Sequence, residues 1–533
     1  MTLFNCKPAK RIASGFHPDP SICEKPDGGY VMVNSSFEFM PGLPVFESED
    51  GEHWTKVGHA LSRPSQFPYE SMGNSQGIYA PTIRYHDGLY YLIVTNVNVG
   101  NMLLTASDPS GEWSDPIWIP DWPGIDPSLF FDDDGTVYIC GNESGCVDED
   151  GNHEEAGIYL SRLDVTTGEV LDKRKRICGG ITGSNPEGPH MLKRGDMYYL
   201  MWAEGGTESG HMENIARSNK ADGPYEMYSG NPLITNRSTH LTLQAIGHCD
   251  CAHFEDERTL MVFHGTRNND EYPAQGWIGR EPYAVWFTWK DGWPQLADQS
   301  YDCTLNGNGD ALEHDVEWIT PGRDDYGRYS VSPNQGVADS DESVFDIEVS
   351  ASGNDFDLPN DGAPLIGTRQ TDMDCLFEAA VVPGVSCETA VAGIAAYGND
   401  KHVITVSIER GAAKDSESAE NAPNKQGGKD STSAEQYTVS AQVNNAGLRS
   451  TVGSIAMDGS QPVTLRLLGT NAGYVCSVQT ADGLVHELGP VPGKVLSFTN
   501  AGGFTGTLLG VFAHGTGQVK FSQVRYQPLM ASR

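Results

Sequence analysis

The sequence predicts an all-β protein in which a five-bladed β-propeller is followed by a β-sandwich, and three observations lead to this fold class. A chain of 533 residues is too long for one ordinary core, so at least two domains are expected. Its 61 Gly and 31 Pro are spread among many aromatic residues, which favours short strands joined by tight turns. A strand-turn-strand motif also recurs along the first part of the chain.

The recurring motif is a short strand, a polar turn and a second, strongly apolar strand. Its copies are DPSICEKPDGGYVMV from Asp19, APTIRYHDGLYYLIV from Ala80, DPSLFFDDDGTVYIC from Asp126, EGPHMLKRGDMYYLMW from Glu187 and HCDCAHFEDERTLMVF from His248. Consecutive copies start 46 or 61 residues apart, which is the length of a four-stranded propeller blade rather than of a helical repeat. Residues 1–310 are therefore expected to form five blades.

A propeller of this kind brings acidic residues together from distant parts of the chain. If the repeats are related by rotation about one axis, the first residue of each innermost strand lies near that axis. In four repeats these first residues are Asp19, Asp126, Glu187 and His248. Carboxylates that share a small space raise the pKa of at least one member, so that one acid stays protonated while another is ionised. Each acid alone is equally compatible with a structural role in a turn.

The charge balance limits the partners of the protein. With 35 Lys and Arg against 72 Asp and Glu, the formal net charge is −37, which disfavours nucleic acid, anionic membranes and polyanionic substrates. No signal peptide or membrane-spanning run is found, and a cytoplasmic location is expected. The 11 Cys residues are scattered, which favours reduced thiols over a disulfide framework.

The second half of the chain has a different pattern. Residues 311–344 are polar and rich in turn residues, and they are predicted to be a linker or an irregular bridge. Residues 345–533 contain alternating runs such as HVITVSIE and QYTVSAQV, which predict a β-sandwich. Within them, residues 411–436 contain no large apolar residue and are expected to be a disordered surface loop.

Ordered motifs then identify a resemblance. GFHPDPSI, SSFEFMPGLPVFESED, GIYAPTIRYHDGLYY, GIDPSLFFDDDG, NPEGPHML, AEGGTESGH, IGHCD and IGRE occur in this order between about residues 10 and 300. Together they resemble glycoside hydrolase family 43, in its β-xylosidase and α-L-arabinofuranosidase branches. LIGTRQTDMDCLFEAAV, AGIAAYGNDKHVITVSI and GFTGTLLGVFAHG resemble the C-terminal concanavalin A-like domain of the family's β-xylosidases.

The resemblance implies an inverting glycosidase with three catalytic carboxylic acids. Asp19 matches the general base, which Pro18 and Pro20 brace, and Glu187 matches the general acid. Asp126 matches the acid that tunes the pKa of Glu187 and orients the site. Inversion requires the base and the acid to stand roughly 6.5 to 9.5 Å apart, with room for a water molecule.

Further residues match substrate-binding positions of the family. They are Phe37, Tyr79, Thr207, His248, Arg280 and Phe504. Many relatives carry Trp at the position of Tyr79, so the shape of the pocket and its sugar preference are left open. Phe504 is equally well explained as a core aromatic residue of the sandwich. No cofactor is required, and the resemblance allows a structural divalent cation such as calcium at the propeller axis, beside His248.

Three functional hypotheses follow. The first is an exo-acting β-xylosidase that releases xylose from the non-reducing end of β-1,4-xylo-oligosaccharides, with α-L-arabinofuranosidase side activity allowed. The second is an enzyme that acts mainly as an α-L-arabinofuranosidase on oligosaccharides from arabinoxylan or arabinan. The third is a non-catalytic carbohydrate-binding protein, since fold alone does not settle function. The expected partner is a neutral oligosaccharide, and a homo-oligomer is compatible with the sequence.

Overall fold

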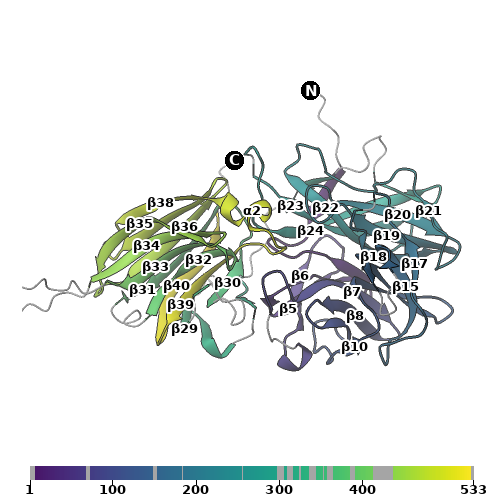
Figure 1. Cartoon of the computed structure of the whole chain (residues 1–533), viewed down its shortest axis with the longest axis horizontal. Coiled ribbons are helices and arrows are strands. Elements are labelled where there is room, and N and C mark those ends of the chain that lie inside the picture. The colour runs from purple at the N-terminus through teal and green to yellow at the C-terminus, as the bar shows by residue number, and fades with distance from the viewer. Residues whose placement is uncertain are drawn as a thin grey trace, which may run out of the picture. The chain divides into compact units, whose positions relative to one another are not determined.

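The computed structural model is an all-β protein made of two compact units (Figure 1). It describes all residues except 1–6, 68–71, 148–152, 183, 255, 270, 297–304, 309–315, 323–325, 335–343, 352, 354, 357–363, 384–389, 412–435 and 530–533. Unit 1 comprises residues 1–315, 319–324 and 502–506, and unit 2 comprises 316–318, 325–501 and 507–533. Almost all of the expected disordered loop 411–436 lies outside the described residues. Among the described helices, none is long and apolar enough to cross a membrane.

The described part of unit 1 contains five sheets of four or more strands, and each sheet starts with one copy of the repeat. The first is β2(Ser21–Glu24), β3(Tyr30–Val33), β5(Gly42–Ser48), β6(Thr55–Leu61). The second is β7(Ile78–His86), β8(Leu89–Asn96), β9(Gly100–Ala106), β10(Ile117–Ile119). The third is β11(Ile125–Phe131), β12(Val137–Glu143), β15(Gly157–Asp164), β16(Glu169–Val170), with β17(Lys175–Cys178) also paired to β15.

The fourth and fifth sheets continue this order. The fourth is β18(Glu187–Arg194), β19(Met197–Glu204), β20(Met212–Ser218), β21(Glu226–Met227). The fifth is β22(Leu243–Ala252), β23(Arg258–Arg267), β24(Arg280–Lys290), β1(Lys7–Arg11), β26(Leu305–Asn308), with β25(Trp293–Gln295) also paired to β24. A strand from the start of the chain therefore completes the last sheet.

Buried apolar clusters link these five sheets to one another. Each cluster contains residues of two sheets, for example Val33 and Leu92, Leu103 and Leu129, Cys140 and Met191, Met201 and Met261, or Met32 and Leu260. These pairs link the first sheet to the second, and so on to the fifth, and the last pair links the fifth sheet back to the first. Burial of apolar side chains between successive sheets is the main stabilising term for such an arrangement.

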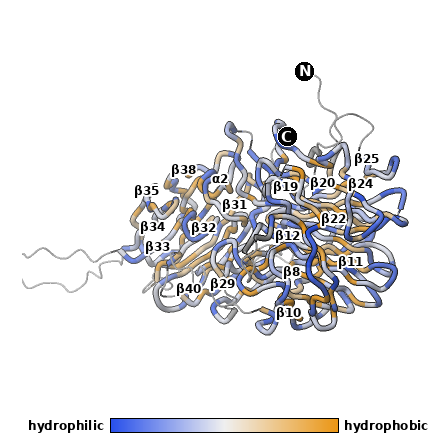
Figure 2. Tube along the Cα trace, turned by 45° about the vertical axis from the view of Figure 1, so that its right-hand side comes forward, coloured by the Kyte–Doolittle hydropathy of each residue, from blue (hydrophilic) through white to orange (hydrophobic). Residues whose placement is uncertain are grey.

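Unit 2 contains two further sheets in the part that the structure describes. One has the order β28(Tyr329–Pro333), β29(Val344–Ser350), β40(Gln518–Pro528), β31(Cys375–Val381), β36(Val463–Thr470), β37(Gly473–Thr480), β38(Val485–Pro492). The other has the order β30(Leu365–Arg369), β39(Leu508–Gly515), β32(Ala390–Asn399), β33(His402–Arg410), β34(Gln436–Asn445), β35(Leu448–Asp458). Orange, hydrophobic segments lie mainly in the interior, whereas blue, hydrophilic segments are common at the periphery (Figure 2).

The segment 311–344, predicted to be a linker, contains regular structure where it is described. β27(Thr320–Pro321) pairs with β4(Phe39–Met40), and the amide of Gly322 donates to the carbonyl oxygen of Glu38 at 2.7 Å. β28 pairs with β29. The polar composition of the segment concealed both strands because they are short and lie at sheet edges.

Candidate active site

One pocket in unit 1 is lined by every residue that the sequence placed in the site. These residues are Asp19, Phe37, Tyr79, Asp126, Glu187, Thr207, His248, Arg280 and Phe504, and Ala80 and Ile125 join them. Although Phe504 follows most of unit 2 in the chain, residues 502–506 belong to unit 1. Ala80 is the first residue of the second copy of the repeat, whereas Ile125 was not singled out from the sequence because it carries no reactive group.

The pocket is built on a bulge near the start of the inner strands. The antiparallel register shifts between Ile78 and Pro81, Ile125 and Ser128, Glu187 and His190, and Gly247 and Asp250. Such a bulge inserts residues that have no paired residue on the neighbouring strand, and this changes the direction of their side chains. In four of the five sheets, residues at or beside this bulge line the pocket, whereas Asp19 precedes the first strand of the remaining sheet, where the register does not shift.

The bulges correct one detail of the repeat alignment. Asp19, Asp126 and His248 share a left-handed backbone, with φ of 52°, 52° and 57°. The residue of the fourth sheet with this conformation is Gly188, at φ 55°, and not Glu187. Glu187 corresponds instead to Ile125, one position earlier. Non-glycine residues rarely adopt positive φ, and such strain is concentrated at functional sites.

Asp19 is held as an ionised carboxylate. Its Oδ1 accepts a hydrogen bond of 2.5 Å from Nη1 of Arg280, and its Oδ2 accepts one of 2.5 Å from Oγ of Ser35. Burial alone would raise the pKa of Asp19, but the positive charge of Arg280, followed by that of His248, lowers this pKa far below its usual range. Asp19 is therefore ionised at neutral pH.

The backbone around Asp19 is fixed by residues that the sequence analysis missed. The amide of Asp19 donates to Nδ1 of His264 at 3.1 Å, while Nε2 of that ring lies 3.3 Å from Oγ1 of Thr207. Burial, assisted by Arg280, lowers the pKa of His264 to about 3, so the ring is neutral and its Nδ1 can accept. Just before Asp19, the carbonyl oxygen of Pro18 accepts from the amide of Ser35 at 3.1 Å.

Glu187 has the opposite environment. Burial, followed by the negative charge of Asp126, raises its pKa to about 8, so that it carries a proton at neutral pH. Its Oε1 is buried and has no hydrogen-bond partner among the described residues. The neighbouring carboxylate oxygen Oδ2 of Asp126 accepts from the amide of Gly188 at 3.0 Å and lies 3.7 Å from Nε2 of His248.

His248 supplies positive charge in the middle of these acids. Burial would lower the pKa of this histidine, but the charges of Asp19, Asp126 and Glu187 raise it to about 9. Its ring packs on Gly188, where an added Cβ would come within 2.8 Å of ring atoms. Glycine is required there by both this contact and its positive φ.

Three aromatic rings form one wall of the pocket. The ring centroid of Phe37 lies 4.8 Å from that of Tyr79 and 5.7 Å from that of Phe504. Ser75 connects Tyr79 and Phe504. Its carbonyl oxygen accepts a hydrogen bond from the Tyr79 hydroxyl at 3.0 Å, and its Oγ accepts one from the Phe504 amide at 2.7 Å. Phe504 therefore contributes to the pocket rather than to the core of the sandwich.

A second charged cluster ties the inner strands together near the pocket. Asp250 is fully buried and accepts hydrogen bonds from Nη1 of Arg84 at 2.8 Å and from Oγ of Ser21 at 2.6 Å. Nδ1 of His190 lies 3.6 Å from the same carboxylate. Burial would raise the pKa of Asp250, but Arg84 lowers it to about 2. The cluster joins residues of the first, second, fourth and fifth sheets.

The expected divalent cation beside His248 has no evident protein ligand set. Among the described residues, no three His, Cys, Asp or Glu side chains are grouped so that they could hold a metal ion. His248 lies instead beside Asp126, with 3.7 Å between Nε2 and Oδ2. The cation stays a prediction.

Comparison with known proteins identifies the family. A family model described as glycosyl hydrolases family 43 matches residues 9–294, which is more than half of the chain. The chain belongs to this family. The family 43 assignment confirms the resemblance of the first unit and makes the protein a glycosidase. A second model, described as the β-xylosidase C-terminal concanavalin A-like domain, matches residues 353–527.

Individual family 43 proteins resemble the chain over different lengths. It is 32% identical over 528 residues to a non-reducing end α-L-arabinofuranosidase of Bacteroides ovatus, covering 95% of this chain and 91% of that relative. It is 40% identical over 295 residues to a xylosidase/arabinosidase of Butyrivibrio fibrisolvens, covering 53% of this chain and 55% of the relative. A solved structure described as Bacteroides ovatus Xyloglucan PUL GH43B has a TM-score of 0.80 at 28% identity, covering 98% of this chain and 100% of that one.

Proposed function

We propose that the protein is an exo-acting, inverting glycosidase that releases xylose from the non-reducing end of β-1,4-xylo-oligosaccharides. In this proposal Asp19 is the general base and Glu187 the general acid, while Asp126 raises the pKa of Glu187. The supporting observation is that Asp19 and Glu187 line one pocket but have opposite environments. Asp19 is bound by Arg280, whereas Glu187 is buried beside another carboxylate. Two acids whose pKa values are driven apart are suited to base and acid roles.

The mechanism follows from these protonation states. Asp19 removes a proton from a water molecule, which attacks the anomeric carbon from the face opposite the leaving group. Arg280 and Ser35 each occupy one carboxylate oxygen of Asp19, and each oxygen keeps a further lone pair for that water. Glu187 donates its proton to the glycosidic oxygen as the bond breaks. Proton exchange with solvent then restores both acids.

Substrate contacts are assigned to polar atoms that the protein leaves unsatisfied. Nη2 of Arg280, Nδ1 of His248 and Oε1 of Glu187 are buried and make no hydrogen bond with a described residue. Buried polar groups without partners are costly, and the hydroxyl groups of a sugar would satisfy them. The ring of Phe37 and its two aromatic neighbours are suited to the C–H face of that sugar.

A second candidate activity is the release of terminal α-L-arabinofuranose by the same acids. It is favoured by the similarity to the Bacteroides ovatus arabinofuranosidase, which extends over 95% of this chain. The xylosidase proposal is favoured instead by the matched β-xylosidase C-terminal domain and by the xylosidase/arabinosidase relative. Both activities require the same inverting chemistry, and they differ only in the sugar that the pocket accepts.

We also infer that the five sheets of unit 1 are the blades of a propeller. The buried clusters that link each sheet to the next, and the fifth to the first, support a closed ring. Four inner strands contribute residues to the Asp250 cluster, and five sheets contribute residues to the pocket. Both observations support a common axis. This arrangement explains how residues more than 200 positions apart reach one site.

The proposal is tested by comparing initial rates on p-nitrophenyl β-D-xylopyranoside and p-nitrophenyl α-L-arabinofuranoside. A preference for the xyloside that is lost in Asp19→Asn supports the first activity, and a preference for the arabinoside supports the second. Proton NMR of the xyloside reaction should show α-xylose before mutarotation. β-Xylose as the first product would refute the inverting mechanism, and full activity of Asp19→Asn would refute the role of Asp19.

A further inference from the structure

A buried carboxylate at the end of β19 has no role in the chemistry proposed above. Glu204 is the last residue of this strand, and its side chain is fully buried. It belongs to the AEGGTESGH motif of the sequence, from which Thr207 lines the pocket and Glu204 does not. Burying a carboxylate is costly unless strong hydrogen bonds compensate for the lost water. The partners of Glu204 therefore indicate what it does.

Both carboxylate oxygens of Glu204 accept hydrogen bonds from the connection between β17 and β18. Oε1 accepts from the amide of Ile181 at 2.5 Å, and Oε2 accepts from the amide and the hydroxyl of Thr182 at 2.8 and 2.5 Å. The indole of Trp202 also donates to Oε1, at 2.7 Å. All four groups are donors, which suits an ionised carboxylate, because that group only accepts.

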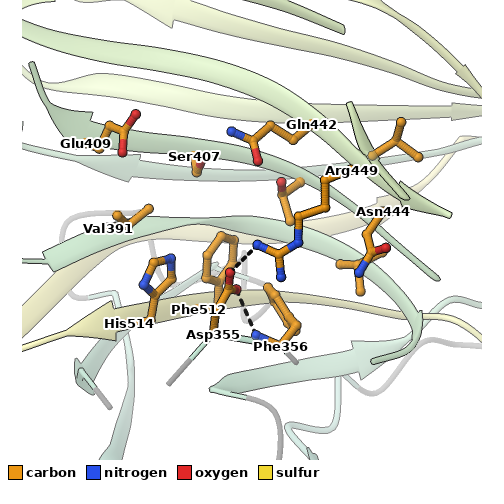
Figure 3. Close-up of a pocket in the computed structure, with 13 residues that line it drawn as sticks. Asp355, Phe356, Val391, Ser407, Glu409, Gln442, Asn444, Arg449, Phe512 and His514 are labelled. Atoms are coloured by element: carbon orange, nitrogen blue, oxygen red, sulfur yellow. Dashed lines mark hydrogen bonds and ion pairs between the residues drawn. The ribbon is translucent and has the colours of Figure 1, made fainter. Parts of the chain in front are cut away.

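This environment differs from that of a carboxylate paired with a cation. In unit 2, Asp355 lines a cavity and is bound by Nη1 of Arg449 at 2.5 Å and by the amide of Phe356 at 2.7 Å (Figure 3). None of the four donors to Glu204 carries a charge, and three of them belong to two consecutive residues of one connection. Glu204 therefore organises a backbone segment rather than neutralising a cation.

The segment that is held in this way leads directly into β18, whose first residue is Glu187. On the way, the carbonyl oxygen of Ser184 accepts from the amide of Gly205 at 2.9 Å. Glu187 itself pairs with Ala203 in the ladder between β18 and β19. The backbone that precedes Glu187 is therefore fixed to the end of β19, where Glu204 lies.

A close approach at Gly180 shows how tightly the connection surrounds the carboxylate. Gly180 has a φ of 79°, and a Cβ at this position would come within 2.8 Å of Oε1 of Glu204 and within 3.4 Å of the Cβ of Pro186. Glycine is required there by both the positive φ and the lack of space. Because Pro186 immediately precedes Glu187, the turn around Glu204 lies against the residue that leads into the acid.

The effect of Glu204 on the acid is one of geometry. Burial and then the negative charge of Asp126 raise the pKa of Glu187, whereas the carboxylate of Glu204 is directed at Ile181 and Thr182. A general acid must stand within hydrogen-bond reach of the oxygen that it protonates. A displacement of about 1 Å at such a group costs up to about a hundredfold in rate.

We propose that Glu204 is a positioning residue for the general acid, which holds residues 180–182 so that the carboxyl group of Glu187 reaches the glycosidic oxygen. The inference rests on the acid role proposed for Glu187. Support of this kind, from a side chain that is itself locked by hydrogen bonds, keeps a reacting group in its productive geometry. Loss of Glu204 should impair proton donation to the leaving group and spare the binding of the sugar.

The test compares xylobiose with p-nitrophenyl β-D-xylopyranoside in Glu204→Gln. The amide group of Gln replaces one acceptor by a donor, which then faces donors of the connection. We expect kcat on xylobiose to fall about thirtyfold, while kcat on the aryl xyloside stays within about threefold and its KM is unchanged, because this leaving group needs little protonation. If the enzyme prefers the arabinoside, arabinobiose and p-nitrophenyl α-L-arabinofuranoside take the place of this pair.

Two further variants separate positioning from a general structural role. Thr182→Val removes only the hydroxyl that donates to Glu204, and it should show the same pattern with a loss of about three- to tenfold on xylobiose. Glu143→Gln is the matched control. Glu143 is buried at the end of β12, as Glu204 is at the end of β19, but its Oε2 lies 3.4 Å from Nη1 of Arg174. This variant should leave the ratio of the two rates unchanged.

Equal losses on both substrates in Glu204→Gln and Thr182→Val would overturn the positioning role, as would wild-type rates in both proteins when their circular dichroism spectra are native. If Glu204→Gln does not fold, Thr182→Val decides alone. Glu187→Gln is assayed beside them. Equal losses in that variant would overturn the proposed acid and this inference with it, whereas a leaving-group pattern in Glu187→Gln alone would overturn only the role of Glu204.

Discussion

Asp19 and Arg280 are 261 positions apart in the chain, yet their side chains are joined by a hydrogen bond of 2.5 Å. Asp19 is only 4% exposed, so without this cation its negative charge would be strongly disfavoured. The pair explains how a buried carboxylate remains ionised and able to act as a base. Arg280 is therefore the main positive charge that keeps Asp19 ionised.

Replacing Arg280 by an uncharged residue should introduce an acidic limb into the pH profile. In Arg280→Met the pKa of Asp19 rises, because burial is no longer opposed by the nearest positive charge. We expect kcat/KM at neutral pH to fall about a hundredfold, within the range for impaired acid–base catalysis. Activity should fall further as the pH decreases. Arg280→Lys keeps the charge and should show a much weaker acidic limb; equal limbs in both variants would contradict this account.

The protonation state of Glu187 predicts a loss of activity on the alkaline side of the pH profile. With a pKa of about 8 it is protonated below this pH and loses its proton as the pH rises, so kcat/KM of the wild type should decrease through about pH 8. Asp126→Asn removes one of the charges that raise this pKa, so the basic limb should move to lower pH. The measurement is the pH profile of kcat/KM for both proteins. A limb that stays in place would show that Asp126 does not tune Glu187.

The role of Glu187 as proton donor should depend on the leaving group. Glu187→Gln should decrease kcat on xylobiose about a thousandfold, within the usual range for general acid catalysis. The decrease should be far smaller on p-nitrophenyl xyloside, whose leaving group needs little protonation. Glu208→Gln, an exposed residue nearby in the chain, is the control and should have wild-type rates. Equal losses on both substrates would assign Glu187 another role.

The aromatic wall should contribute to substrate binding rather than to chemistry. Tyr79→Ala removes a ring that contacts Phe37 and Phe504, and we expect KM to rise about tenfold with a smaller change in kcat. Tyr79→Phe keeps the ring and loses only the hydrogen bond to Ser75, so its KM should stay close to that of the wild type. A large fall in kcat with unchanged KM in the Ala variant would be inconsistent with a binding role.

The buried pair of Arg84 and Asp250 should be important for stability. Arg84→Met leaves a fully buried carboxylate without its cation, and we expect unit 1 to lose about 3–5 kcal/mol. Urea unfolding followed by tryptophan fluorescence measures this loss. Arg162→Met is the control because Arg162 and Asp172 form an exposed pair, whose removal should have little effect. An Arg84→Met protein as stable as the control would refute the prediction.

Much of the site could be predicted from the sequence because its residues lie in local, repeated motifs. A strand, a turn and a second strand are encoded within fifteen or so neighbouring residues, and their repetition indicated which positions would converge. All the predicted residues do line one pocket. The alignment of Glu187 with Asp19 was nevertheless one residue wrong, because Gly188 occupies the left-handed position and a bulge cannot be located from composition.

The sequence by itself determined the all-β class, the repeats and the acids that approach one another. The resemblance assigned the protonated role to Glu187, but only the tertiary structure shows the environment that keeps the proton there. That choice depends on burial and on partners such as His264 and Arg280, which come from other strands. Local patterns specify strands, whereas pKa values and cavities depend on atoms that only the folded chain brings within a few ångströms.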